Sequence, residues 1–151
     1  IMVTLKKLKT KLLQMLQNDF DTNEYAYYTN STVEDYQRPC FFTQETIKSV
    51  DAINNYARQV RVEFVIEYLQ ETVDEVDMLI VAETIRNIFG KLFKVETTPV
   101  YIETFSYDIV GNENEVLQII MEVSYTESVG IVTTDAEIMG SLSYKQRNEV
   151  R

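Results

Sequence analysis

Carboxylates, tyrosines and one cysteine are the residues here that could carry chemistry, because the sequence contains no histidine. Without histidine there is no Ser-His-Asp triad and no histidine-ligated zinc, and a lone cysteine forms neither a CxxC redox centre nor an intramolecular disulfide. Cys40 has no imidazole to activate its thiol, so we predict a small buried or half-buried residue rather than a nucleophile.

The best-spaced carboxylate pair lies on one face of a predicted strand. Glu63 and Glu67 are four residues apart, a separation that could combine a general acid with a general base. Nothing around them in the sequence would separate their pKa values, however. Two solvent-facing carboxylates beside Arg61 are therefore the simpler interpretation, and we predict no catalytic residues.

One short segment imitates a metal site. The sequence DFDTN from Asp19 resembles the first half of an EF-hand loop, but the sixth position is Glu24 rather than glycine and the twelfth is Asn30 rather than glutamate. The four glycines are too widely separated to form a phosphate-binding loop. We therefore predict no metal site and no cofactor, and we expect that the protein is not an enzyme.

Tyrosine is the most suggestive residue type, with ten copies and no tryptophan. Tyr25, Tyr27 and Tyr28 crowd into one short segment, and tyrosine favours interfaces because its ring is apolar while its hydroxyl is polar. Tyrosine also favours strands, so an ordinary edge strand over residues 24–29 is the alternative interpretation.

The charge balance indicates which partners to exclude. The chain has 24 acidic and 14 basic residues, a formal charge of −10, which repels nucleic acid and anionic membranes. No apolar run approaches the roughly 20 residues that span a bilayer, and the lysines among the first leucines do not fit a secretory signal. We expect an intracellular chain that starts at Met2, with Cys40 reduced, and neither nucleic acid nor membrane as a partner.

Two amphipathic helices are predicted to frame the strands. Residues 3–18 place leucines at helical spacing opposite lysines, and residues 18–38 form a polar excursion that carries the edge strand. Thr72 and Glu75 match a capping box that begins the second helix. The expected buried stripe of that helix consists of Met78, Val81, Ala82, Ile85, Ile88, Phe89 and Leu92, and Gly90 is the alternative, earlier end of the helix.

Alternating apolar residues predict four long strands. Residues 40–47 and 58–70 are expected to pair antiparallel across a loop over residues 49–56. Residues 100–110 and 116–126 are expected to form a second hairpin around the turn at 111–114.

No repeat or linker divides the 151 residues. We predict a single α+β domain, in which a mainly antiparallel sheet of four to five strands has two helices packed on one face. The domain would span residues 2–132, and residues 133–151 would form a polar C-terminal arm or tail.

Four segments resemble the tail terminator of long-tailed phages and prophages. They are residues 38–42 (RPCFF), 61–68 (RVEFVIEY), the helical residues 81–89, and 111–119. The resemblance extends from Met2 to about Thr126 in element order. It implies a structural phage protein that caps the tail tube as a ring, usually a hexamer, stops tail polymerisation and provides the head-joining surface.

The resemblance also implies where such a protein acts and with what. Its partners would be further copies of itself, the tail tube protein and the head-tail connector protein, first in the host cytoplasm during assembly and then in the virion. Its functional residues would lie on loops and edges and on the arm after Gly130. The interface candidates are Asp51, Ile53, Asn54, Asn55, Tyr56, Tyr25, Tyr27 and Tyr28.

Two other classes of protein stay open. A small intracellular adaptor module would bind a peptide by pairing it to an exposed strand edge, and it would be a monomer even at high concentration. An enzyme acting through carboxylates alone would need a deep pocket lined by two converging acidic side chains.

Overall fold

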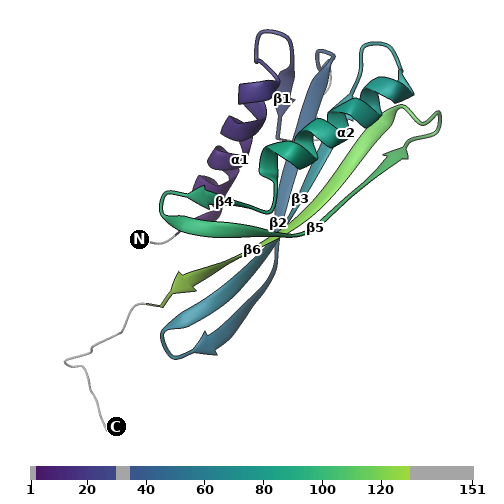
Figure 1. Ribbon diagram of the computed structural model, residues 1–151. Helices are drawn as coiled ribbons and strands as arrows, with labels where there is room; N and C mark the ends of the chain where they lie inside the picture. Colours follow the sequence, from purple (N-terminus) through teal and green to yellow (C-terminus); the bar gives the residue numbers. More distant parts are fainter. Residues whose placement is uncertain (1–2, 30–34, 130–151) are drawn as a thin grey trace, which may run out of the picture.

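One sheet and two helices make up the described part of the chain, which is residues 3–29 and 35–129 of the computed structural model (Figure 1). The strands lie in the order β1-β2-β3-β6-β5-β4. The elements are α1 (Leu5–Asp19), β1 (Ala26–Tyr28), β2 (Cys40–Asn54), β3 (Ala57–Leu69), α2 (Glu75–Phe89), β4 (Leu92–Val95), β5 (Thr98–Val110) and β6 (Val116–Ser128). The α+β class is confirmed, but the sheet has six strands rather than four to five.

The sheet is mixed, because β1 runs parallel to β2 while every other neighbouring pair is antiparallel. A parallel pair requires the chain to return to the same end of the sheet between the two strands. The polar excursion that precedes Cys40 provides that return. The edge strand predicted over residues 24–29 is confirmed as β1, which is only three residues long.

Strand β4 was not predicted, and it corrects the end of the second helix. Gly90 has a positive φ of 60° and follows Phe89, the last residue of α2. That backbone turn ends the helix, so Leu92 lies in β4 with its side chain exposed rather than in the buried stripe of α2. Four residues are too few for alternation to be recognised in a sequence.

The start of α2 also differs from the predicted capping box. The N-cap is Asp74 rather than Thr72, and the Asp74 carboxylate accepts hydrogen bonds from the backbone N–H groups of Val76 and Asp77. The Gln70 side chain selects this position, because its Oε1 accepts from the Asp74 N–H at 2.8 Å while its Nε2 donates to the Asp74 carbonyl at 2.9 Å. A side-chain contact across the turn therefore decided between two good capping residues.

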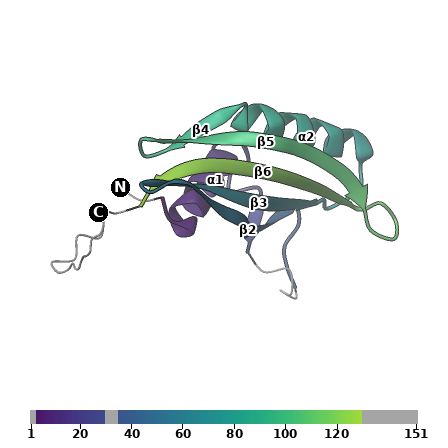
Figure 2. The ribbon, with the colours of Figure 1, turned by 90° about the horizontal axis from the view of Figure 1, so that it is seen from below.

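The main core lies between the sheet and both helices. The central strands β3 and β6 contribute alternate residues, as their sequences predict, and α1 and α2 cover them on the same face. Figure 1 shows both helices in front of the sheet, and Figure 2 shows the strands curving along their length. The core side chains from β3 and β6 are Val60, Val62, Phe64, Ile66, Tyr68, Leu117, Ile119, Met121, Val123 and Tyr125.

The boundary predicted between domain and tail, and the arm after Gly130, lie outside the described residues. Within the described ranges, neither helix is long and apolar enough to cross a bilayer.

Candidate interaction surfaces

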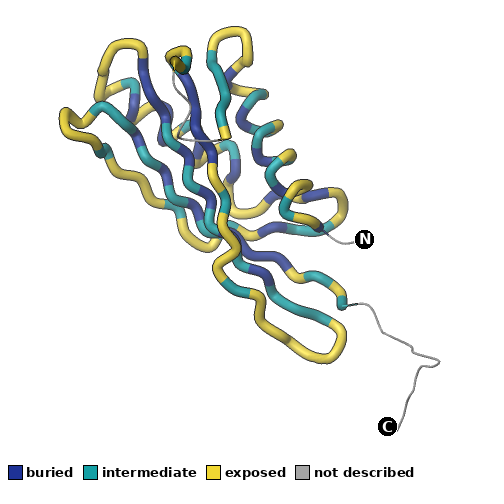
Figure 3. The backbone as a smooth tube through the Cα atoms, turned by 180° about the vertical axis from the view of Figure 1, so that it is seen from behind, coloured by how far each residue is buried: buried dark blue, intermediate teal, exposed yellow. Residues whose placement is uncertain are grey.

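The β2–β3 hairpin extends well past the two helices. Figure 1 shows it projecting from the body of the molecule, with the end of β6 beside it. We call residues 47–59 the distal arm. Figure 3 shows this part mainly in the colours of exposed and intermediate residues, whereas the same strands are mostly buried or intermediate behind the helices. In the distal arm, β2 and β3 continue beyond the part of the sheet that α1 and α2 cover.

The arm corrects the loop predicted over residues 49–56, because β2 continues to Asn54 and pairs with β3 almost to the turn. The register shifts twice, between Ile47 and Ser49 and again between Ala52 and Asn54. Each shift is a bulge that moves the following side chains to the other face. The two bulges removed the regular alternation on which the prediction of a strand would have depended.

Three contacts make the arm a defined structure rather than a flexible loop. The N–H of Tyr56 donates to the Asn54 Oδ1 at 2.7 Å within the turn, and the N–H of Val129 donates to the Tyr56 carbonyl at 2.8 Å. Arg58 and Glu127 form an ion pair at 2.8 Å between β3 and β6. The end of β6 therefore supports the hairpin as a third strand.

The arm exposes four large apolar side chains. Ile47, Val50, Ile53 and Tyr56 are between 47% and 60% exposed. Single exposed apolar residues are normal on protein surfaces, but several grouped on one projection are typical of an interface. Of the predicted interface candidates, Asp51, Ile53, Asn54, Asn55 and Tyr56 all lie here and are exposed.

The tyrosine segment lies at the other end of β2 and packs against the body. Tyr27 stacks on Phe41 with ring centroids 5.4 Å apart, and its hydroxyl donates to the Phe20 carbonyl at 2.7 Å. Tyr25 packs edge-on against Phe20, at 5.3 Å. Tyr28 stacks on Phe42 at 5.3 Å. These contacts leave Tyr25, Tyr27 and Tyr28 half-buried, and an interface role for them stays a prediction.

A small second core forms on the opposite face of the sheet. Cys40, Phe42 and Leu69 are buried there beneath Tyr28 and Tyr36. Burial raises the pKa of the Cys40 thiol to about 11, against a smaller opposing effect of Arg38. The thiol is therefore protonated at neutral pH, and the predicted burial of Cys40 is confirmed.

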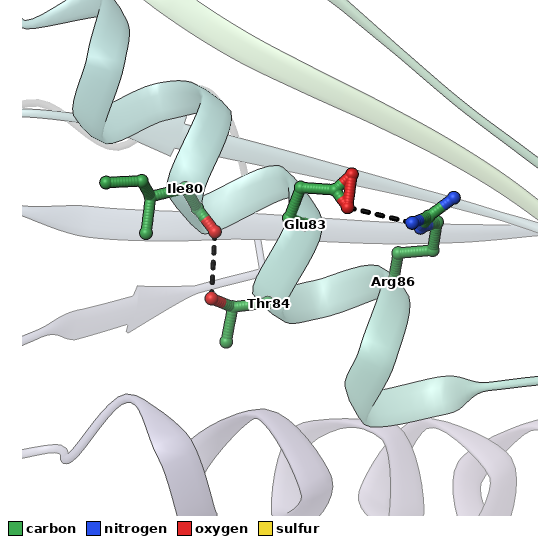
Figure 4. Close-up of polar contacts among 4 residues, drawn as sticks. All are labelled: Ile80, Glu83, Thr84 and Arg86. Carbon is green, nitrogen blue, oxygen red and sulfur yellow. Dashed lines mark hydrogen bonds and ion pairs between the residues drawn. The ribbon is translucent and has the colours of Figure 1, made fainter.

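The outward side of α2 carries an apolar surface, which is not among the predicted interface candidates. Figure 4 shows Ile80 beside polar contacts on this helix, where the Thr84 hydroxyl donates to the Ile80 carbonyl at 2.8 Å and Arg86 pairs with Glu83 at 2.8 Å. We call Val73, Val76, Leu79 and Ile80 the α2 stripe; all four side chains are at least 40% exposed. The signal was present in the sequence VDMLIVA, which is apolar on more sides than one core can cover.

The face of the sheet turned away from the helices is acidic. Glu63 of β3 lies directly opposite Glu122 of β6, and Glu67 is opposite Gln118, whose amide donates to it at 3.2 Å. Like charges in directly opposed positions destabilise a sheet. The predicted solvent-facing placement of Glu63 and Glu67 is confirmed by their position on this face. No group of three or more potential metal-ligating side chains occurs among residues 3–29 and 35–129.

These features define a small α+β protein with two exposed apolar surfaces and an acidic sheet face. The family model described as phage tail terminator protein matches residues 7–136, and the chain belongs to this family. Among solved structures, the chain is similar to one from the virion of a native gene transfer agent (GTA) particle, with 12% identity and a TM-score of 0.50. That match covers 78% of this chain and 92% of the other, and it shows a shared fold. No curated protein matches the sequence.

The family confirms the resemblance inferred from residues 38–42, 61–68, 81–89 and 111–119. The protein is a structural component of a phage tail, and its family is one of structural proteins rather than enzymes.

Proposed function

We propose that the protein caps the tail tube as a closed ring, stops tail polymerisation and presents the surface to which the head connector joins. Membership of the tail terminator family over residues 7–136 is the observation that carries this proposal. A symmetric tube is capped most simply by a cyclic homo-oligomer, and we propose a hexamer. Assembly would take place in the host cytoplasm, and the product would be part of the virion.

The acidic sheet face supports a place beside the DNA channel. A channel wall rich in lysine or arginine would hold the phosphate backbone of the passing DNA, whereas carboxylates repel it. Glu63 and Glu122 lie directly opposite each other on this face, and such a pair reduces the stability of the subunit. Repulsion of DNA is a function that would explain the pair. We accordingly propose that the chain binds neither duplex nor single-stranded DNA at physiological salt.

The exposed residues of the distal arm are proposed to be assembly contacts. The residues 133–151 are proposed to form a separate polar arm that acts together with a partner, as their composition suggests.

Light scattering coupled to size exclusion tests the ring directly. The protein is measured over a wide concentration range, alone and with purified tail tube, and particles are inspected by electron microscopy. We expect weak self-association in isolation and closed rings on tube ends when tube is present. A strict monomer under every condition, with no density on tube ends, would contradict the proposal.

A phage that lacks the protein tests its role in length control and head joining. We expect tails of uncontrolled length with few attached heads, and normal lengths again when the protein is supplied from a plasmid. Tails of normal length joined to heads in the absence of the protein would exclude both roles.

The adaptor class has one supporting observation and one against it. In the described ranges β1 covers only residues 40–42 of β2, and β4 covers only residues 98–101 of β5. Much of β2 and of β5 therefore has no strand on its outer side. Both open edges contain register shifts, however, and bulges discourage the pairing of a further strand. We therefore favour the ring.

A further inference from the structure

We propose that the distal arm of one copy docks on the α2 stripe of the next copy around the ring. This inference rests on the proposed function, because it assumes that copies of the chain assemble. It identifies which two surfaces meet, and it makes the contact heterologous, with each copy contributing a different surface to each of its two neighbours.

The first support is that the chain has two separate groups of exposed apolar side chains. The arm presents Ile47, Val50, Ile53 and Tyr56, and the α2 stripe presents Val73, Val76, Leu79 and Ile80. Figure 1 shows the tip of the arm and helix α2 in different parts of the molecule, so one copy cannot cover its own stripe with its own arm. Both groups would be removed from water by a head-to-tail contact between copies.

The second support is charge. The distal arm carries Lys48, Arg58 and Asp51, and Arg61 lies just beyond it, although the whole chain has a formal charge of −10. Arg58 already pairs with Glu127, so Lys48 and Arg61 are the basic side chains that the arm offers to a partner. Residues 71–86 carry five acidic side chains and a single basic one, Arg86, which already pairs with Glu83. The arm is thus the more basic of the two surfaces and the helix the more acidic. Opposite charges around an apolar contact favour this pairing.

The same charges disfavour the symmetric alternatives. Two arms in contact would bring basic residues together, and two α2 stripes would bring acidic residues together. Like charges at an interface reduce affinity and suppress the wrong pairing. A contact between unlike surfaces remains, and it generates a ring when the rotation between copies closes.

The shape of the arm fits this role. Its third strand and the Arg58–Glu127 pair hold the hairpin extended, so docking needs little ordering of the chain. A pre-ordered projection loses less conformational entropy on binding than a flexible loop would.

Cross-linking through introduced cysteines tests the pairing. Ile53→Cys and Ile80→Cys are made singly and together, and Cys40 is fully buried and serves as an internal unreactive thiol. With a short bismaleimide and tail tube present, the double variant is expected to yield a ladder of cross-linked oligomers. Each single variant alone should yield none, and a mixture of the two single variants should yield dimers only.

Disrupting variants provide a second, independent measurement. Ile53→Asp and Ile80→Asp are each expected to raise the concentration needed for rings by about tenfold or more, because a carboxylate enters an apolar contact. In a mixture of the two variants, the intact arm of Ile80→Asp can still dock on the intact α2 stripe of Ile53→Asp. The other two surfaces are disrupted, so the mixture should give dimers without rings. Tyr101→Asp is the matched control, because Tyr101 is 48% exposed but lies outside both surfaces.

The outcomes separate this inference from the proposed function. Rings that form without any link between positions 53 and 80 would overturn the inference and leave the ring intact. Links between two arms would indicate a symmetric dimer, and links from position 53 to the tube protein would assign the arm to the tube; either result overturns the inference. A monomer that gives neither rings nor cross-links with tube present would overturn the inference and the proposed function together.

Discussion

The body of the molecule and the distal arm are built from the same strands but differ in what covers them. Behind the helices, β3 and β6 bury every second residue against α1 and α2. In the arm, β2 and β3 continue to pair across two bulges, yet residues 50–56 are all exposed. Backbone hydrogen bonding is therefore similar in the two regions, while apolar burial is concentrated in the body.

This difference separates stability from assembly. Apolar burial is the main favourable term in folding, so changes in the body should act on the free energy of unfolding. The arm contributes little burial within one copy, so changes there should act on contacts with other molecules. The following predictions test that division, from the largest expected effect on stability to the smallest.

Truncation of a core aromatic residue on β3 should have the largest effect. Phe64→Ala removes a side chain that is 1% exposed, and we expect unfolding to become easier by about 3–5 kcal/mol, measured by urea denaturation. Val65→Ala on the opposite, partly exposed face of the same strand is the control and should cost much less. Equal losses for the two variants would contradict the assignment of one core to one face.

Tyr68 links β3 to the start of α2 and should have the second largest effect. Its hydroxyl donates to the Asp77 carboxylate at 2.8 Å, and Gln70 donates to the same oxygen at 2.7 Å. We expect Tyr68→Phe to cost about 1–2 kcal/mol in urea denaturation, because a buried hydrogen bond to a charged group is lost. A change within experimental error would mean that Gln70 alone satisfies Asp77.

The same residue predicts how stability depends on alkaline pH. Burial, followed by the hydrogen bond to Asp77, raises the pKa of Tyr68 above its ordinary value of 10.0. Above about pH 10 the unfolded chain loses this proton while the folded protein keeps it, so stability falls as pH rises. Burial also raises the pKa of Tyr27, so Tyr68→Phe should reduce the slope of the decline without removing it. An unchanged slope would contradict the assignment to Tyr68.

The ion pair that supports the arm should have a smaller effect. Arg58→Gln removes the ion pair with Glu127. Because the Arg58 side chain is 40% exposed, we expect the free energy of unfolding to fall by no more than about 1 kcal/mol. Hydrogen exchange should become faster for backbone amides near the arm, with little change in the centre of β3. Faster exchange throughout the sheet would show that the arm and the body unfold as one unit.

Replacing the tip of the arm should have the smallest effect on stability. Asp51, Ile53 and Asn55 are replaced by Gly and Ser, and Asn54 is replaced by Ser, whose hydroxyl keeps an acceptor for the Tyr56 N–H. We expect the free energy of unfolding to change by about 0.5 kcal/mol or less, because these side chains are exposed. Calorimetry measures the stability. Electron microscopy of lysates from a phage carrying the variant should show defective tails or detached heads, and normal particles would exclude the tip as an assembly contact.

The sequence predicted those elements whose patterns are regular over many residues. Val60, Val62, Phe64, Ile66 and Tyr68 alternate without interruption, and the strand and its buried face followed directly. The predicted buried stripe of α2 was correct from Met78 to Phe89, although Ile88 is only partly buried.

Irregular elements could not be predicted in the same way. Two bulges hid the strand in residues 49–54, and four residues were too few to reveal β4. The cap of α2 depended on Gln70, because two suitable residues lie two positions apart and only a contact across the turn distinguishes them. For the interface candidates, residue type indicated exposure of the arm tip but did not reveal that the three tyrosines pack on Phe20, Phe41 and Phe42.

Local patterns alone were enough for the α+β class, the two amphipathic helices, the long antiparallel strands and the family, because periodicity and short motifs are properties of neighbouring residues. Tertiary structure decided that β1 is parallel, that β2 continues as an arm and that α2 leaves an apolar stripe uncovered. Each of these depends on where the helical cover of the sheet begins and ends. The extent of the helical cover is set by contacts between segments that are distant in the sequence, and no stretch of neighbouring residues specifies such contacts by itself.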